Sequence, residues 1–278
     1  MKNISLIALF TLLFTSCASR KPLNQKKASI YYGHGTQKLI EKNYTEALTF
    51  LLQASELDPE NTDILTNLGM AYYFKKELGL AKKHFNEALE ADPKNSDARN
   101  NLASIYLEQK NYAEAKRHYN IIKKDLTYPK QFRTNYNLAL IELHEEKKQV
   151  AIDLLKLASK EKQDYCAANT LLGKTYYETR HYKDALEWFK KATMGKCFSE
   201  PLPHYFIGKT FVEMRRYDEA IQKFVELQER FAQSRYSSLS SLELKKIRSL
   251  RENESIEKKN WSKWREEKDL KNYRSPSF

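Results

Sequence analysis

The stretch Thr62–Pro93, TDILTNLGMAYYFKKELGLAKKHFNEALEADP, contains the pattern that decides the fold. Ala81 stands twelve residues after Gly69, and Phe85 follows that alanine four residues later. A small residue equivalent to Gly69 recurs at intervals of 34, 34, 36, 34 and 35 residues, at Gly35, Gly69, Ala103, Ala139, Gly173 and Gly208. A period of this size predicts a stack of similar supersecondary units. Such stacks are typical of binding proteins.

The rest of the pattern is kept in all six copies. The alanines are Ala47, Ala81, Ala115, Ala151, Ala185 and Ala220, and the large residues are Leu51, Phe85, Tyr119, Leu155, Phe189 and Phe224. Small residues in two antiparallel helices let them approach closely, and the large residue fills the space beside them. The turn between the two helices is expected at Tyr44, Tyr112, Tyr182 and Tyr217. Asp58-Pro59 and Asp92-Pro93 end the second helix, because proline disfavours a helical residue before it.

Together these residues resemble the tetratricopeptide repeat, most plainly in Leu68-Gly69-x-x-Tyr72 and in Ala81, Phe85, Ala88 and Pro93. The expected fold is all-α, a right-handed superhelical solenoid of six repeats with a C-terminal capping helix. The repeats cover residues 28–233 and start at Ala28, Thr62, Ser96, Phe132, Cys166 and Pro201. Residues 234–251 are predicted to form the capping helix, and residues 252–278 a basic charged tail.

The N-terminus has the layout of a secretory signal. Met1–Asn3 is positively charged, and the apolar run Ile4–Phe14 is too short to cross a bilayer but suits a signal peptide. The sequence that ends the run, Leu13-Phe14-Thr15-Ser16-Cys17, resembles the bacterial lipobox. This implies a signal peptide over residues 1–16 and a lipidated tether over residues 17–27. The alternative is an ordinary signal peptide with an incidental cysteine.

The lipobox resemblance also implies a compartment. Cys17 would carry a diacylglyceryl and an acyl chain, and several chains anchor a protein stably. Ala18 stands where an aspartate would resemble an inner-membrane retention signal. The expected location is therefore the periplasmic face of the outer membrane, and no other cofactor is expected.

The positive charge of the chain raises the question of nucleic acid. The formal net charge is +12, but 48 lysines and arginines are mixed with 36 acids along the chain. A nucleic-acid binder is expected to concentrate its basic residues on one recognisable module, so this class is not favoured. Residues 245–278 hold a local excess of basic residues around Trp261 and Trp264. This tail could contact anionic lipid or polysaccharide, or it could be a frayed charged end.

The sequence contains none of the motifs that enzymes of common classes carry. There is no glycine-rich phosphate loop, no G-x-S-x-G and no H-E-x-x-H. The histidines lie in separate repeats without metal-ligand spacing, at His34, His84, His118, His144, His181 and His204. We therefore expect no catalysis, no metal site and no small-molecule substrate.

A protein partner is expected in the concave groove, which the first helix of each repeat lines. Tetratricopeptide proteins that clamp a partner's C-terminal carboxylate use basic groups, but the matching positions here are Tyr32, Thr36, Thr66 and Met70. Such a clamp is therefore not favoured. The predicted groove residues are Tyr32, Leu39, Met70, Tyr73, Phe74, Leu107, Tyr136, Leu140, Tyr177 and Tyr205. This aromatic and apolar set suits an amphipathic helix or an extended apolar segment.

Two cysteines remain once Cys17 is lipidated. Cys166 and Cys197 are positions 1 and 32 of the same repeat, where antiparallel packing brings the start of the first helix near the end of the second. In an oxidising compartment they are predicted to form a disulfide. The alternative is two free thiols.

A lipobox followed by six repeats resembles the pilotin lipoproteins of type IV pili, the PilF, PilW and Tgl family. The local match includes Asn100-Asn101-Leu102, the run Leu107–Ala115, and the connector Leu126-Thr127-Tyr128-Pro129. The resemblance implies binding of the outer-membrane secretin subunit, and its localisation and assembly into the pilus pore. Two other classes remain open: a general periplasmic scaffold in envelope assembly or regulation of a peptidoglycan enzyme, and an enzyme accessory domain.

Overall fold

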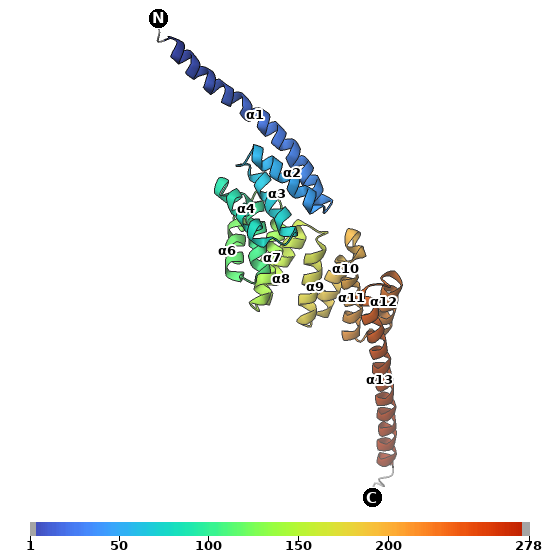
Figure 1. The fold of residues 1–278 in the computed structure, drawn as a ribbon. Coiled ribbons are helices and arrows are strands. Elements are labelled where there is room, and N and C mark those ends of the chain that lie inside the picture. Colours follow the sequence, from blue (N-terminus) through green and yellow to red (C-terminus); the bar gives the residue numbers. More distant parts are fainter. Residues whose placement is uncertain (1–3, 274–278) are drawn as a thin grey trace. The chain divides into compact units, whose positions relative to one another are not determined.

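The structure is a computed structural model that describes the backbone of residues 4–273 and the side chains of residues 22–268. Within this range the regular elements are thirteen α-helices and one short 3-10 helix (Figure 1). The chain divides into two compact units, Met1–Glu146 and Lys147–Phe278. Successive helices pack in pairs within each unit. The predicted all-α repeat fold is therefore confirmed.

The first unit contains seven helices that follow one another along the chain. They are α1 (Ile4–Ile40), α2 (Tyr44–Leu57), α3 (Thr62–Phe74), α4 (Leu78–Ala91), α5 (Ser96–Glu108), α6 (Tyr112–Lys123) and α7 (Gln131–His144). The pairs α1 and α2, α3 and α4, and α5 and α6 pack together, and each second helix also contacts the next first helix. The first helices α1, α3, α5 and α7 also contact one another in succession.

The second unit continues the same order and ends in a long helix. Its elements are α8 (Lys148–Glu161), α9 (Cys166–Glu178), α10 (Tyr182–Lys191), η1 (Gly195–Ser199), α11 (Pro201–Glu213), α12 (Tyr217–Arg230) and α13 (Arg235–Tyr273). The helix α13 packs on α12 and α11. It contributes the buried Ile247 to a core cluster with Phe189, Phe224 and Leu227, and so covers the last repeat.

The core of each repeat is built where the sequence pattern predicts. Phe85 of α4 is buried against Gly69 of α3, and the same cluster includes Ala98 and Leu102 from the next repeat. The large residue thus packs within its own repeat and against its neighbour. Each repeat buries its apolar side chains only together with the next one, as expected of a stacked array.

The turn from the first to the second helix has one conformation in all six repeats. The second residue after the end of each first helix has a positive φ of 56° to 67°, at Lys42, Lys76, Lys110, Glu146, Arg180 and Arg215. Amide N–H groups in these turns donate back to carbonyls of the helix just ended, as from Lys110 to Leu107 and from Asn111 to Tyr106. This is the helix-ending motif that usually places glycine at the left-handed position. Charged residues occupy it here.

The two terminal helices extend beyond the repeats. The backbone of α1 is helical from Ile4, so it continues through the predicted signal peptide and tether, Pro22 included. The helix predicted to end at Arg251 continues to Tyr273, and its side chains are exposed over residues 255–268. A search of the described residues identifies no helix of sufficient length and apolar character to cross a membrane.

Candidate partner-binding surface

The predicted groove residues of the first unit all lie on first helices. Tyr32 and Leu39 are on α1, Met70, Tyr73 and Phe74 on α3, Leu107 on α5, and Tyr136 and Leu140 on α7. We call these eight side chains the first-helix surface. Seven are half-buried, and Phe74 is 40% exposed. Because α1, α3, α5 and α7 are in contact in that order, these side chains belong to one row of neighbouring helices.

The aromatic residues at the end of α3 are held by both neighbouring repeats. The ring of Phe74 stacks on Tyr44 of the preceding repeat at 4.8 Å between centroids. It also meets the ring of Tyr73 edge to face at 5.5 Å. The Tyr73 hydroxyl donates to Glu108 Oε2 of the following repeat at 2.9 Å. These contacts fix two aromatic rings that remain partly open to solvent, which lowers the entropy lost when a partner packs on them.

Polar contacts near Tyr32 explain why this surface lacks a basic clamp. Asn67 Nδ2 donates to Thr36 Oγ1 at 2.9 Å and so joins α3 to α1. Burial raises the pKa of Tyr32, and nearby Asp63 raises it further, while hydrogen bonds with Thr36 and Asn67 act in the opposite direction. Thr36, one of the four positions of a carboxylate clamp, thus joins two repeats, and none of the four carries a positive charge.

Sequence reasoning missed the carboxylates that border this surface. Asp97 accepts from the Tyr128 hydroxyl at 2.8 Å and from Lys130 Nζ at 2.8 Å, so it holds the connector between α6 and α7. Glu108 accepts from Tyr73, with Lys76 Nζ 3.8 Å away. The sequence does contain a pattern that could have predicted these contacts. A tyrosine is followed by a glutamate 35 or 36 residues later in both units, as Tyr73–Glu108 and Tyr177–Glu213.

The two predicted groove residues of the second unit, Tyr177 and Tyr205, differ in their exposure to solvent. Tyr177 on α9 is half-buried, and its hydroxyl donates to Glu213 at 3.3 Å. Tyr205 on α11 is only 8% exposed, so its assignment to the groove was wrong. Its ring lies 5.5 Å from that of Tyr236 on α13, and its hydroxyl donates to Glu243 of the same helix at 3.1 Å. Tyr205 is buried because α13 packs on α11, the first helix of the last repeat, as the next repeat would do.

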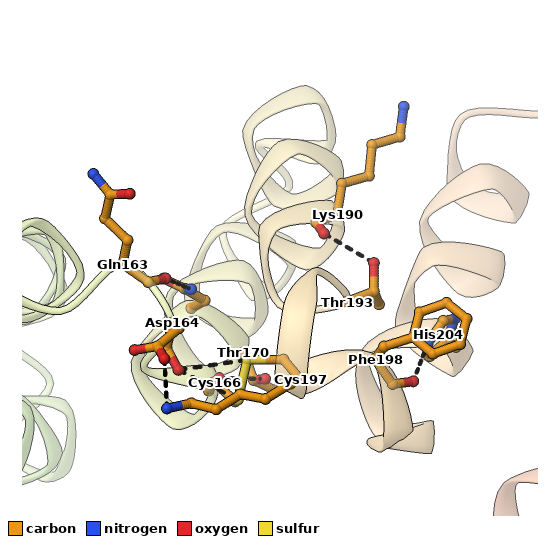
Figure 2. The surroundings of a disulfide bond; sticks show 11 residues. Gln163, Asp164, Cys166, Thr170, Lys190, Thr193, Cys197, Phe198 and His204 are labelled. Carbon is orange, nitrogen blue, oxygen red and sulfur yellow. Dashed lines mark hydrogen bonds and ion pairs between the residues drawn. A yellow bond between two sulfur atoms is a disulfide. The ribbon is translucent and has the colours of Figure 1, made fainter.

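A disulfide joins Cys166 and Cys197, with 5.4 Å between the α-carbons. It ties η1 to the start of α9 (Figure 2). Two further contacts hold the same connector: Lys196 forms an ion pair with Asp164, and His204 Nε2 lies 3.1 Å from the Phe198 carbonyl oxygen. The connector between α10 and α11 is thus fixed to helices on both of its sides.

The side chain of Cys17 lies outside the described residues, so its lipidation stays a prediction.

Among the histidines, His118 is buried beside Arg117, with 3.1 Å between Nε2 and the guanidinium nitrogen. Burial, followed by the charges of Arg117 and Arg99, lowers its pKa to about 4. This histidine is neutral at pH 7 and forms part of the core.

Comparison with known proteins identifies the repeat. Profiles described as tetratricopeptide repeat match residues 62–95, 84–117 and 167–194. The chain therefore contains tetratricopeptide repeats. A search of curated proteins finds no relative of this chain.

Solved structures with the same repeat cover most of the chain. The pilF protein of Pseudomonas aeruginosa is 21% identical, with a TM-score of 0.69, over 79% of this chain and 99% of that one. PilW, a type IV pilus biogenesis factor, is 20% identical, with a TM-score of 0.67, over 75% and 96%. A chain of the APC/C hetero-tetramer Cut9-Hcn1 is 16% identical at a TM-score of 0.67, over 80% of this chain and 43% of that one. At these identities the likeness concerns the fold, which very different assemblies share.

Proposed function

We propose that this protein is a lipid-anchored outer-membrane lipoprotein that binds a protein partner through the first-helix surface. We further propose that it acts as a pilotin for the secretin of type IV pili. The observation that carries the binding proposal is the pair Tyr73 and Phe74, two rings fixed by neighbouring repeats and partly exposed. Fixed aromatic side chains are the usual anchors of protein interfaces.

The pilotin assignment rests on the sequence more than on the fold. The lipobox at Cys17 implies an anchored protein, and the local match at Leu107–Ala115 and at the Tyr128-Pro129 connector resembles the pilotin family. A lipid anchor at Cys17, within α1, would keep the first unit close to the membrane that a secretin must enter. The general periplasmic scaffold is the second candidate, because the repeat fold occurs at a similar TM-score in an unrelated assembly.

The binding surface can be tested with two matched double variants. Tyr73→Ser with Phe74→Ser removes both rings, whereas Leu80→Ser with Ile121→Ser removes two apolar side chains of similar exposure on second helices, 41% and 40%. We expect the first variant to lower the amount of heat-stable secretin multimer in cells and the second to leave it unchanged. Circular dichroism of both purified proteins checks that the fold is kept.

The outcomes separate the two parts of the proposal. Normal multimer levels in the folded Tyr73/Phe74 variant would place the site elsewhere. Normal levels in a full deletion would remove the pilotin assignment, and a pull-down from native envelopes would then identify the partner of a scaffold. Mass spectrometry of the mature N-terminus tests the anchor separately: an acyl mass on Cys17 is expected, and cleavage at another residue would contradict it.

A further inference from the structure

The second unit contains a cavity at α8 and α10, which are the second helices of their repeats. The first-helix surface, in contrast, lies on the first helices of the repeats. The helix α10 has 10 residues where α8 and α12 have 14, because it ends at Lys191 and the chain turns at Gly195, whose φ is +57°. A cavity of 560 Å³ lies between the last turns of α8 and α10 and the connector that follows. Its volume is in the range of ligand-binding sites.

The charged groups of this cavity are mainly lysines. Lys156 and Lys160 project from successive turns of α8, and Lys191 lies on α10. Among the described residues no ion pair joins Lys156 or Lys160 to a carboxylate. The Lys156 ammonium lies 5.8 Å from the Tyr176 ring centroid, and a hydrogen bond with Tyr176, with Asp153 and Asp184 nearby, raises its pKa. Lys191 is paired with Glu187 at 2.9 Å. The one acid of the lining, Asp164, is already paired with Lys196.

The rest of the lining includes apolar side chains and the side-chain amide of Gln163. Trp188 is half-buried, with Lys191 Nζ 4.0 Å from its ring centroid. Met194 is 63% exposed, and Gln163 lies in the turn between α8 and α9. The disulfide at Cys197 fixes the connector that contributes Met194 (Figure 2). The cavity therefore combines cations, one aromatic ring and a flexible thioether on a connector that is held in place.

The cavity lies at the C-termini of two helices, and this position limits the classes of ligand that it can bind. The last carbonyls of a helix have no partner within the helix and carry partial negative charge. Phosphate sites are commonly built at helix N-termini and from arginine forks, so a compact dianion fits poorly here. The end carbonyls of α10 already accept hydrogen bonds, such as Lys191 O from the amide of Met194. A peptide suits the lining better, because its carboxylates can bind the lysines while an apolar side chain packs on Trp188 and Met194.

We propose that this cavity binds an acidic peptide segment of a partner protein, with carboxylates on Lys156 and Lys160 and an apolar side chain on Trp188. The site is independent of the first-helix surface and adds a second contact on the other helix of the repeat. Because the contacts are mainly electrostatic, binding should weaken as salt concentration rises.

The test uses Trp188 as its own reporter. The chain has three tryptophans, so Trp261→Phe and Trp264→Phe leave Trp188 as the only tryptophan, which can be excited selectively over the tyrosines. The probe is an acetylated, amidated five-residue peptide with two aspartates on each side of a leucine, and its match has asparagines in place of the aspartates. Lys156→Gln with Lys160→Gln removes the two lysines of α8, and Lys245→Gln with Lys246→Gln on α13 is the control.

We expect saturable fluorescence changes with the acidic peptide, a Kd at least tenfold higher for the Lys156/Lys160 variant, and no change in Kd for the control. Absence of a fluorescence change, equal binding of the asparagine peptide, or equal binding by both lysine variants would overturn the proposal. A lower Kd for inorganic phosphate than for the peptide would contradict the assignment of an acidic peptide as the ligand. All four lysines are exposed, so circular dichroism is expected to show folded variants.

Discussion

Phe85 lies directly on Gly69: a methyl group added at Gly69 would stand 2.5 Å from Phe85 Cε1. Every repeat with glycine at this position has the same relationship, with Leu51, Phe189 or Phe224 as the large residue. The spacing of about 34 residues in the sequence is therefore the spacing of one close helix contact. This contact sets how near the two helices of a repeat approach.

Replacement of Gly69 by alanine tests this contact. The extra methyl group must displace the Phe85 ring or the helix backbone, which typically costs about 1–3 kcal/mol, and this is only partly offset by the higher helix propensity of alanine. Gly79→Ala is the matched control, because nothing lies within 4 Å of its added methyl group. Urea unfolding should show a loss for Gly69→Ala and an unchanged or higher stability for Gly79→Ala. Equal effects would contradict the packing account.

The left-handed turn residues predict a stabilising substitution. Lys110 has a φ of 59°, a conformation that costs a non-glycine residue roughly 1 kcal/mol. Lys110→Gly should therefore raise the free energy of unfolding by up to about 1 kcal/mol. Its neighbour Gln109 has a φ of −77°, so Gln109→Gly gains nothing and should be neutral or destabilising. Thermal unfolding of the two variants decides it, and a lower melting temperature for Lys110→Gly would be the contrary result.

The disulfide predicts a dependence of stability on reducing agent. Cys166 and Cys197 are 31 residues apart, and closing a loop of this length stabilises by about 3–4 kcal/mol in the chain-entropy model. The Cys166→Ser, Cys197→Ser variant should unfold at lower denaturant concentration and should no longer respond to dithiothreitol. Thiol titration of the unfolded, unreduced wild type should find neither of these cysteines reactive. Two reactive thiols would show that the bond does not form.

Buried His118 predicts a loss of stability in acid. Its pKa is lowered from 6.5 to about 4 in the folded protein, so below pH 6.5 the unfolded chain binds a proton that the folded chain does not. Stability from this group is complete above pH 6.5 and falls as the pH drops toward 4, by about 2 kcal/mol at pH 5. His118→Phe keeps a ring beside Tyr106 but cannot titrate. The wild type should lose more stability than this variant between pH 7.5 and 5, and parallel losses would exclude the assignment.

The repeat core was predictable because it depends on residue size at fixed spacing. Gly69, Ala81 and Phe85 carry that information in the sequence, and the structure buries them together. The turn conformation was not predicted, since Lys110 and Arg180 occupy positions where glycine would have been the signal. The end of α13 was missed as well, because the helix continues through charged residues without an apolar period.

The candidate site was less predictable than the core. Phe74 and Tyr73 lie on a first helix as expected, but Tyr205 is covered by α13, an element outside the repeat pattern. The cavity beside Trp188 depends on where α10 stops, and a shortened helix leaves no mark in the alanine and aromatic positions of its repeat. Such features come from the irregular segments between repeats.

The central claim is that the partner binds at the end of α3, and crosslinking in living cells tests it most directly. A photoreactive phenylalanine analogue at position 74 should give an adduct with the secretin subunit, whereas the same analogue at position 80, on the second helix of that repeat, should give none. An adduct from position 80 alone, or none from position 74 in cells with normal secretin multimer, would contradict the account.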